Sequence, residues 1–403
     1  MNDHSSARDG YDTYLWYRDA AERGDPYAQF NLGLLYKAGR GVARDDRQAF
    51  QWMHQAAQQG LAFAQNHLGA MYYGGRGVSC NDREAVRWFR CAARQGDASA
   101  QQNLALMYKK GRGVPRSDHI ALAWCYRASE QGAASAQALL GVAYVHGAGV
   151  RRNYPLALAW LRKAALQNNA GAQLHLGLMY KNGLGVLRND RQALAWLRQA
   201  AAQGQPVAQR LVGVAYAEGQ GVPADPLRAY AWLLRAAEQE DADAQFNLGI
   251  MLANGKGVER DEELAFTWYY RAAQTGHVQA QFNLAGMYAR GRGVARNDAL
   301  ALTWFLAAAE QGAASAQFNV GVMYANGLGA PRNDVRAVAW YRRAAAQGDA
   351  SAQNNLGVMY ANGHGVARDP QRAVQWYAMA ANQGHAQART NLDNLAAQRL
   401  MGQ

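Results

Sequence analysis

The sequence predicts an all-α fold, an α/α superhelical solenoid of ten 36-residue helix-turn-helix repeats with a half repeat at each end. Two observations carry this prediction. A Gly-x-Gly turn signal recurs ten times without insertion or deletion between copies. The tryptophans recur every 36 residues, and none lies outside the series formed by Trp16, Trp52, Trp88, Trp124, Trp160, Trp196, Trp232, Trp268, Trp304, Trp340 and Trp376. Such a period is typical of stacked helical pairs and excludes an assembly of unrelated globular domains.

The first half of each repeat is predicted to be an amphipathic helix. In residues 25–60, Ala28, Leu32 and Tyr36 are four residues apart, which places them on one helix face. The Ala28 position is alanine in every copy, and the Leu32 position is leucine or valine. Gly33 recurs in eight repeats. Because a mid-helix glycine costs about 1 kcal/mol of helix propensity, we expect it to permit close approach of a neighbouring helix.

A glycine turn and a second helix complete each repeat. Gly39 and the glycine two residues later have counterparts in all ten repeats, and glycine tolerates the positive φ that ends a helix. A phosphate-binding loop is excluded because a third glycine, a Lys-Ser/Thr pair and a preceding strand are all missing. Asp45 begins a column of Asp, Asn or Ser, the residues that cap a helix N-terminus. The second helix is predicted to end at the Gly60 position, which is glycine in most repeats but Asn168 and Glu240 in two.

The tryptophan of each repeat lies on the second helix, between the alanine columns of Ala49 and Ala56. One interpretation is a platform on which bases or sugars stack. The simpler interpretation, which we adopt, is a ladder of eleven buried rings packed against small neighbours.

The ends of the chain are predicted to cap the stack. Residues 1–24 form an N-terminal half repeat, a lone second helix with Asp9 as its cap and Gly24 as its end. Residues 25–384 hold the ten repeats, and residues 385–403 form a C-terminal capping helix. Atypical half repeats suit positions where one side of the stack faces water. We therefore expect one continuous solenoid.

The repeated columns A-Q-x-N-L-G-x-M-Y, G-x-G-V, A-x-x-W and A-A-x-x-G resemble the Sel1-like repeat family, a relative of the tetratricopeptide repeats, over residues 8–392. The resemblance implies a noncatalytic scaffold or adaptor for protein complexes, often in bacterial signalling, envelope assembly or host interaction. We therefore expect a bacterial regulatory or complex-assembly role, with a toxin-neutralising, immunity-type protein as an alternative. Some secreted members carry paired cysteines in each repeat, which this sequence lacks.

Cysteine usage and hydropathy bear on the compartment. Cys80, Cys91 and Cys125 are an odd, unpatterned set that makes no disulfide framework. The N-terminus has no basic start followed by an apolar stretch, and no run approaches 18 apolar residues. We expect a cytoplasmic monomer with no membrane partner. The nine histidines are scattered and match no metal or triad pattern, so we expect no cofactor, metal or catalytic residue and no enzyme activity.

The face of the first helix opposite its apolar columns is the candidate partner site. In related helical-pair repeats this helix lines the concave face, so we assign the face to a groove. Three consecutive repeats project phenylalanine there, next to amides and one arginine: Phe246, Phe282, Phe318, Asn247, Asn283, Asn319, Asn355, Asn254, Arg290, Asn326 and Asn362. Rings would take the side chains of an extended peptide and amides its backbone groups. Alternatively, the rings cover neighbouring helices and the amides bond locally.

The formal net charge of +12 suggests a second kind of partner. An arginine column follows the turns: Arg44, Arg116, Arg152, Arg188, Arg260, Arg296, Arg332 and Arg368. Such a row could attract nucleic acid or another polyanion. Alternatively, each arginine pairs with an acid such as Asp46 or caps the carbonyl groups at the end of the first helix. Because the column is nearly uniform, binding of nucleic acid here would be unspecific.

Overall fold

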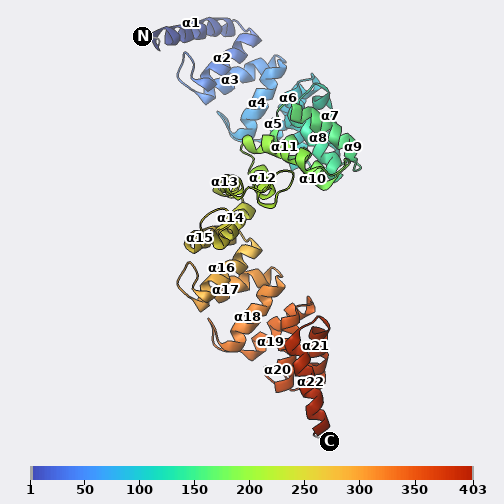
Figure 1. Ribbon diagram of the computed structural model, residues 1–403. Helices are drawn as coiled ribbons and strands as arrows, with labels where there is room; N and C mark the ends of the chain where they lie inside the picture. Colours follow the sequence, from blue (N-terminus) through green and yellow to red (C-terminus); the bar gives the residue numbers. More distant parts are fainter. Residues whose placement is uncertain (1–2, 402–403) are drawn as a thin grey trace. The chain divides into compact units, whose positions relative to one another are not determined.

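The computed structural model describes residues 3–401, which form 22 α-helices and no strand, as predicted (Figure 1). The helices are α1 (Asp3–Glu22), α2 (Pro26–Ala38), α3 (Asp46–Gln58), α4 (Ala62–Gly74), α5 (Asp82–Arg94), α6 (Ala98–Lys110), α7 (Asp118–Glu130), α8 (Ala134–His146), α9 (Tyr154–Leu166), α10 (Ala170–Asn182), α11 (Asp190–Ala202), α12 (Pro206–Glu218), α13 (Pro226–Glu238), α14 (Ala242–Asn254), α15 (Glu262–Gln274), α16 (Val278–Arg290), α17 (Asp298–Glu310), α18 (Ala314–Asn326), α19 (Asp334–Ala346), α20 (Ala350–Asn362), α21 (Pro370–Asn382) and α22 (Ala386–Met401).

The chain forms two compact units, residues 1–203 and residues 204–403. Within each unit, the two helices of a repeat pack on one another, and each second helix also packs on the first helix of the next repeat. The Ala28 and Leu32 columns of the first helices are buried in all ten full repeats, as their spacing predicts. Each unit is therefore a stack of helical hairpins with a continuous apolar interior.

The turn of the first full repeat shows why its glycines and cap residue recur. Gly39 ends α2 with φ 67°, and its N–H donates to the Leu35 carbonyl. A Cβ on Gly41 would lie 1.9 Å from the Gly10 carbonyl oxygen, so no larger residue fits there. The Asp45 carboxylate then accepts from the N–H groups of the first turn of α3. The corresponding side chain caps the second helix in all ten repeats, as predicted.

The N-terminal helix α1 starts earlier than the sequence predicts. It runs from Asp3, so Asp9 lies within α1 instead of at its N-terminus. In the later repeats a Gly-x-Gly turn ends one helix before the cap residue begins the next. No such turn precedes Asp9, so nothing interrupts the helix there.

The prediction of eleven buried tryptophan rings is wrong. Trp268 is buried at 6% exposure, Trp16 is 66% exposed, and the other nine rings are half-buried. The residue after each tryptophan takes the core position instead. Phe89, for example, lies beside Gly69, where a Cβ would come within 2.7 Å of the Phe89 ring. The mid-helix glycine thus admits a large side chain from its own repeat.

The tryptophans from Trp52 to Trp196 pack instead at the border with the preceding repeat. Trp88 contacts the cluster that Ala56 and Ala57 of the preceding repeat form with Leu68 of its own repeat. The outer faces of several rings carry a cation, as where the Arg235 guanidinium lies 4.7 Å from the centre of the Trp232 ring. The tryptophan series therefore marks the joints between repeats.

A ladder of buried glutamines, which the sequence analysis did not single out, joins three helices in most of the repeats that the structure describes. The Gln29 Nε2 donates to the Ala21 carbonyl of the preceding helix (3.2 Å), and its Oε1 accepts from the Gln59 Nε2 (2.9 Å). Nine of the ten repeats described have the glutamine pair: Gln29–Gln59, Gln65–Gln95, Gln101–Gln131, Gln137–Gln167, Gln173–Gln203, Gln209–Gln239, Gln281–Gln311, Gln317–Gln347 and Gln353–Gln383. In the remaining repeat Thr275 replaces the second glutamine, and the buried Gln245 Oε1 has no hydrogen-bond partner.

Candidate functional site

The three predicted phenylalanines occupy equivalent positions on α14, α16 and α18 and are half-buried. Each ring lies against the core aromatic residue of its own repeat. The ring centres are 5.8 Å apart for Phe246 and Tyr269, and 5.4 Å apart for Phe282 and Phe305. Phe318 lies 6.0 Å from the Tyr341 ring in the same way. Each phenylalanine therefore covers the core, and the Phe246 ring is also stacked on the His277 ring, with the two centres 4.7 Å apart.

The predicted amides beside these rings make mostly local hydrogen bonds. Asn355 Nδ2 donates to the Tyr341 hydroxyl (3.3 Å), and Asn319 Nδ2 donates to the Ser315 carbonyl one turn earlier (2.7 Å). Burial raises the pKa of Tyr269 to about 12, opposed by its hydrogen bond with Asn283. These amides therefore have fixed orientations.

A turn further along, the predicted polar residues are exposed. Asn254 Nδ2 donates to the Ile250 carbonyl (2.8 Å), and Asn326 Nδ2 donates to the Val322 carbonyl (2.9 Å). Their exposed side chains remain at the surface of the helix ends, as do those of Arg290 and Asn362.

The structure brings five of the eleven predicted residues into one pocket of about 200 Å³. They come from three consecutive first helices, α14, α16 and α18, and they are Asn254, Phe282, Asn283, Arg290 and Asn319. The other six, which do not line this pocket, are Phe246, Phe318, Asn247, Asn355, Asn326 and Asn362. The pocket is therefore centred on Phe282.

The pocket exists because of a residue that the sequence analysis missed. Gly286 occupies a column that holds Leu, Val, Ile or Ala in the other nine repeats, including Ile250 and Val322 on either side. A Cβ on Gly286 would meet only the end of the Arg290 side chain, at 3.6 Å. The missing side chain leaves open the space above Phe282. Its signal is visible in the sequence as a single departure from an aliphatic column.

The rim of the pocket carries positive charge. Arg290 and Arg292 both line it, are exposed, and form no ion pair with any residue that the structure describes. Glu262, which also lines it, forms an ion pair with Arg260. Two cationic groups are therefore open to a partner, while the one carboxylate is already matched.

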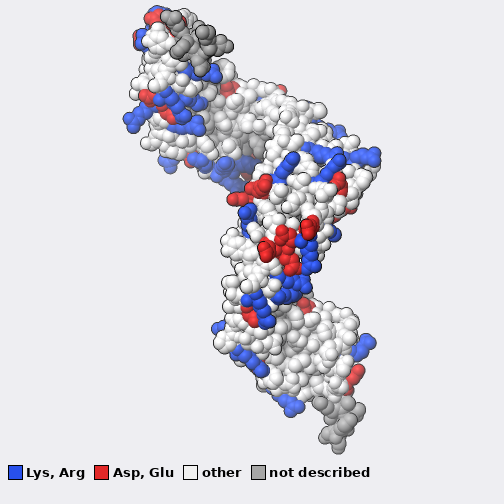
Figure 2. Space-filling model, turned by 60° about the vertical axis from the view of Figure 1, so that its left-hand side comes forward, with Lys and Arg blue, Asp and Glu red and all other residues white. Residues whose placement is uncertain are grey.

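The arginine column is largely neutralised by its neighbours. Six members pair with the acid two residues later, as Arg296 does with Asp298 (2.9 Å) and Arg332 with Asp334 (2.9 Å). The guanidinium of Arg296 holds the pKa of the Asp298 carboxyl below its usual value. On the face that Figure 2 shows, acidic side chains lie beside basic ones at several places. This pairing weakens the field that a polyanion would feel along the turns.

Other kinds of site find little support within the described part of the chain. No group of three or more His, Cys, Asp or Glu side chains in residues 3–401 is placed to hold a metal ion. The three cysteines are unpaired, with Cys125 buried and the other two exposed. None of the helices described is both long and apolar enough to cross a membrane.

Comparison with known proteins identifies the repeat. The model of the family described as Sel1 repeat matches ten segments, residues 26–61, 62–97, 98–132, 134–169, 170–205, 206–241, 242–277, 278–312, 314–349 and 350–385. No curated protein sequence matches the chain.

Two solved structures resemble this chain in both sequence and fold. A protective antigen present in uropathogenic Escherichia coli strains, with an SLR fold, is 38% identical with a TM-score of 0.82 over 95% of this chain and 82% of that one. A Sel1 repeat protein from Oxalobacter formigenes is 35% identical with a TM-score of 0.59 over 75% of this chain and 88% of that one. An immunity protein from Pseudomonas aeruginosa is 21% identical with a TM-score of 0.36, covering 53% of this chain and 81% of its own, which is too low to support a functional inference.

Proposed function

This chain belongs to the Sel1 repeat family, and on that premise we propose that it is a noncatalytic scaffold that binds a partner protein or peptide on the exposed face of α14, α16 and α18. Sel1 repeat proteins generally mediate protein–protein interactions and are generally noncatalytic. The observation that carries the choice of site is the pocket at Phe282, to which three consecutive repeats contribute.

The chemistry of this face suits an extended peptide. The exposed side of Phe282 and the gap left by Gly286 offer a seat for an apolar side chain. Asn283 and Asn319, held in place by the helices, offer amide groups to a peptide backbone. The rings of Phe246 and Phe318 extend the same face into the repeats on either side.

The finer features of the role are part of the proposal. We place the protein in the bacterial cytoplasm as a monomeric adaptor in regulation or complex assembly, with residues 25–384 acting as one repeat array between end caps. The alternative partner for the same face is a toxin domain, which would make the protein an immunity-type inhibitor.

A pulldown with tagged protein tests the site. We expect a defined partner to be lost when Phe246, Phe282 and Phe318 are all changed to Ala. Because those rings also cover the core, Gly286→Val provides a gentler variant: it fills the pocket with the residue found at position 322. Phe63→Ala, which removes an exposed ring from α4 in the other unit, is the matched control. A partner retained by both site variants would rule out this face.

Binding of polyanions along the arginine column is the second candidate. The net charge of +12 favours it, while the six ion pairs within the column oppose it. Filter binding of single-stranded and duplex nucleic acid at low and high salt decides between these effects. Affinity at low salt that falls steeply with added salt would support it, and no affinity at low salt would exclude it.

A further inference from the structure

The unit formed by residues 1–203 contains a second pocket, which is not part of the proposed partner site. It lies between α6, α7 and α8, has a volume of about 280 Å³, and is lined mostly by apolar groups. Leu106, Leu122 and Val142 form part of its wall, and Cys125 and Ala143 also line it. Apolar pockets near this size are typical of sites for small ligands.

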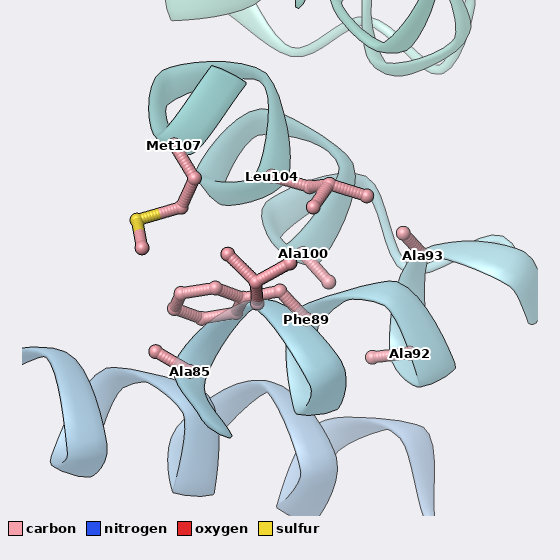
Figure 3. Packing of buried hydrophobic residues seen from close by; sticks show 8 residues of the cluster. Ala85, Phe89, Ala92, Ala93, Ala100, Leu104 and Met107 are labelled. Carbon is pink, nitrogen blue, oxygen red and sulfur yellow. The ribbon is translucent and has the colours of Figure 1, made fainter. Parts of the chain in front are cut away.

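The pocket arises where two large residues are missing from one joint between repeats. At three other joints in this unit, α3–α4, α5–α6 and α9–α10, the residue after tryptophan meets a methionine of the next first helix. Figure 3 shows such a pair, with Met107 of α6 over the ring of Phe89 on α5. Leu161 and Met179 share a cluster in the same way.

At the joint between α7 and α8, both partners are small. Position 125 is cysteine, whereas the equivalent residue is Met, Phe, Leu or Tyr in the other nine full repeats. Position 143 is alanine, whereas seven repeats have methionine there. Ala105, which replaces the usual glycine opposite Cys125, restores only one methyl group. The cavity is therefore encoded by coordinated departures from the repeat.

The mouth of the pocket carries an unmatched positive charge. Lys109, Asp118 and His146 are the polar residues that line it. Asp118 pairs with Arg116 (3.5 Å). Lys109 is exposed and forms no ion pair with any residue that the structure describes. His146 is exposed, with its ring 6.3 Å from that of His175. An apolar interior with a free ammonium group at its edge suits an apolar molecule that ends in an anionic group.

We infer that this pocket binds a small amphiphilic carboxylate, with its chain or ring beside Cys125 and Ala143 and its carboxylate at Lys109. The inference is independent of the peptide face on α14, α16 and α18, which belongs to the other unit. It assigns this chain a ligand site in addition to its proposed role as a scaffold.

Titration calorimetry with the full chain tests the inference, with octanoate as the probe and 1-octanol as its uncharged counterpart. We expect saturable binding of octanoate to the unmodified protein. Lys109→Gln should weaken octanoate binding by about tenfold, the loss of one charge-assisted contact, and leave 1-octanol binding unchanged. Equal affinity of both probes, with no effect of Lys109→Gln, would overturn the carboxylate assignment.

Two variants that fill the pocket locate the binding. Ala143→Met introduces the residue that seven repeats carry, and Ala105→Gly with Cys125→Leu reproduces the pair seen as Gly141 and Leu161. Both follow packing found elsewhere in the chain, so we expect helical circular dichroism to be preserved. Loss of octanoate binding in both supports the site. Unchanged binding in the folded variants, or no saturable binding to the unmodified protein, contradicts it.

Discussion

Replacing Thr275 by glutamine is expected to stabilise the protein, because it completes the one broken step of the glutamine ladder. In the neighbouring repeat, Gln311 Nε2 donates to the Gln281 Oε1 (2.8 Å) and to the Gly276 carbonyl (3.1 Å). Thr275 is too short for this reach, and its hydroxyl instead donates to the Ala272 carbonyl (2.8 Å). The Gln245 Oε1 is consequently buried without a partner.

The size of the effect follows from that single oxygen. A buried acceptor without a hydrogen bond costs about 1–3 kcal/mol. Thr275→Gln removes this cost but loses the local hydroxyl bond, which is worth about 1 kcal/mol, and also orders a long side chain. We expect a net gain of about 1 kcal/mol in the free energy of unfolding. Gln311→Thr, the matched control, should lose about 1–3 kcal/mol by isolating the Gln281 Oε1.

Urea unfolding of the two variants measures these changes, and hydrogen exchange localises them. Because repeats contact mainly their neighbours, we expect altered amide protection to centre on α14 and α15 for Thr275→Gln, and on α16 and α17 for Gln311→Thr. Opposite signs are the essential result. If Thr275→Gln is neutral or destabilising while Gln311→Thr is neutral, the ladder does not hold the joints together.

Three further predictions concern positions where the repeat meets a local constraint. Gly321→Ala should cost about 1–3 kcal/mol in urea unfolding, because its Cβ would lie 2.6 Å from the Tyr341 ring. Gly286→Ala, whose Cβ would make only an ordinary contact with the end of the Arg290 side chain, should gain up to about 1 kcal/mol. Equal effects of the two substitutions would contradict the packing. Glu240→Gly should raise the unfolding midpoint, with a gain of about 1 kcal/mol, because Glu240 has φ 66°; a lower midpoint would refute this. Burial lowers the pKa of His67 and His175, so the unfolded chain binds protons more readily, and stability present above about pH 6.5 falls as the pH drops towards the folded pKa values. Unfolding at about pH 8 and about pH 5 should differ less after both are changed to Asn, and an unchanged difference would exclude these histidines as its source.

Much of the fold could be predicted because its signals are local. The cap at Asp45 and the glycine turn before it act within one helix end, so the sequence alone predicts where α3 begins. Asn168 and Glu240 occupy the column that is glycine in the other repeats, and both adopt the positive φ of that column. The backbone conformation of the repeat is therefore kept there even though neither residue favours it. The tryptophans were misjudged for the opposite reason. Both Trp268 and Tyr269 lie on the apolar side of α15, so the sequence of one helix does not show which position faces the core. That choice depends on the neighbouring helices.

The candidate site was predicted in part. Phe282 and Asn283 could be predicted because phenylalanine and asparagine recur at their positions in the neighbouring repeats, and the structure places both residues at one pocket. Gly286 was missed because a glycine that lacks the usual aliphatic side chain draws no attention as a site residue. Arg292 was not assigned to this site because it lies in the turn after α16, away from the helical face considered. Residues from separate segments converge through packing, which a periodic pattern along one helix does not encode.

The sequence by itself determined the repeat length, the helix ends and the residues of the apolar columns, since these depend on dihedral preference and spacing within about ten residues. The tertiary structure decided which large side chain fills the gap beside each mid-helix glycine, how the buried glutamines pair across 30 residues, and where pockets open. These features depend on how volumes and hydrogen-bond partners match between helices. A small residue such as Cys125 or Gly286, at a position where other repeats carry a larger one, leaves a cavity only when the side chains of the opposite wall do not fill the space.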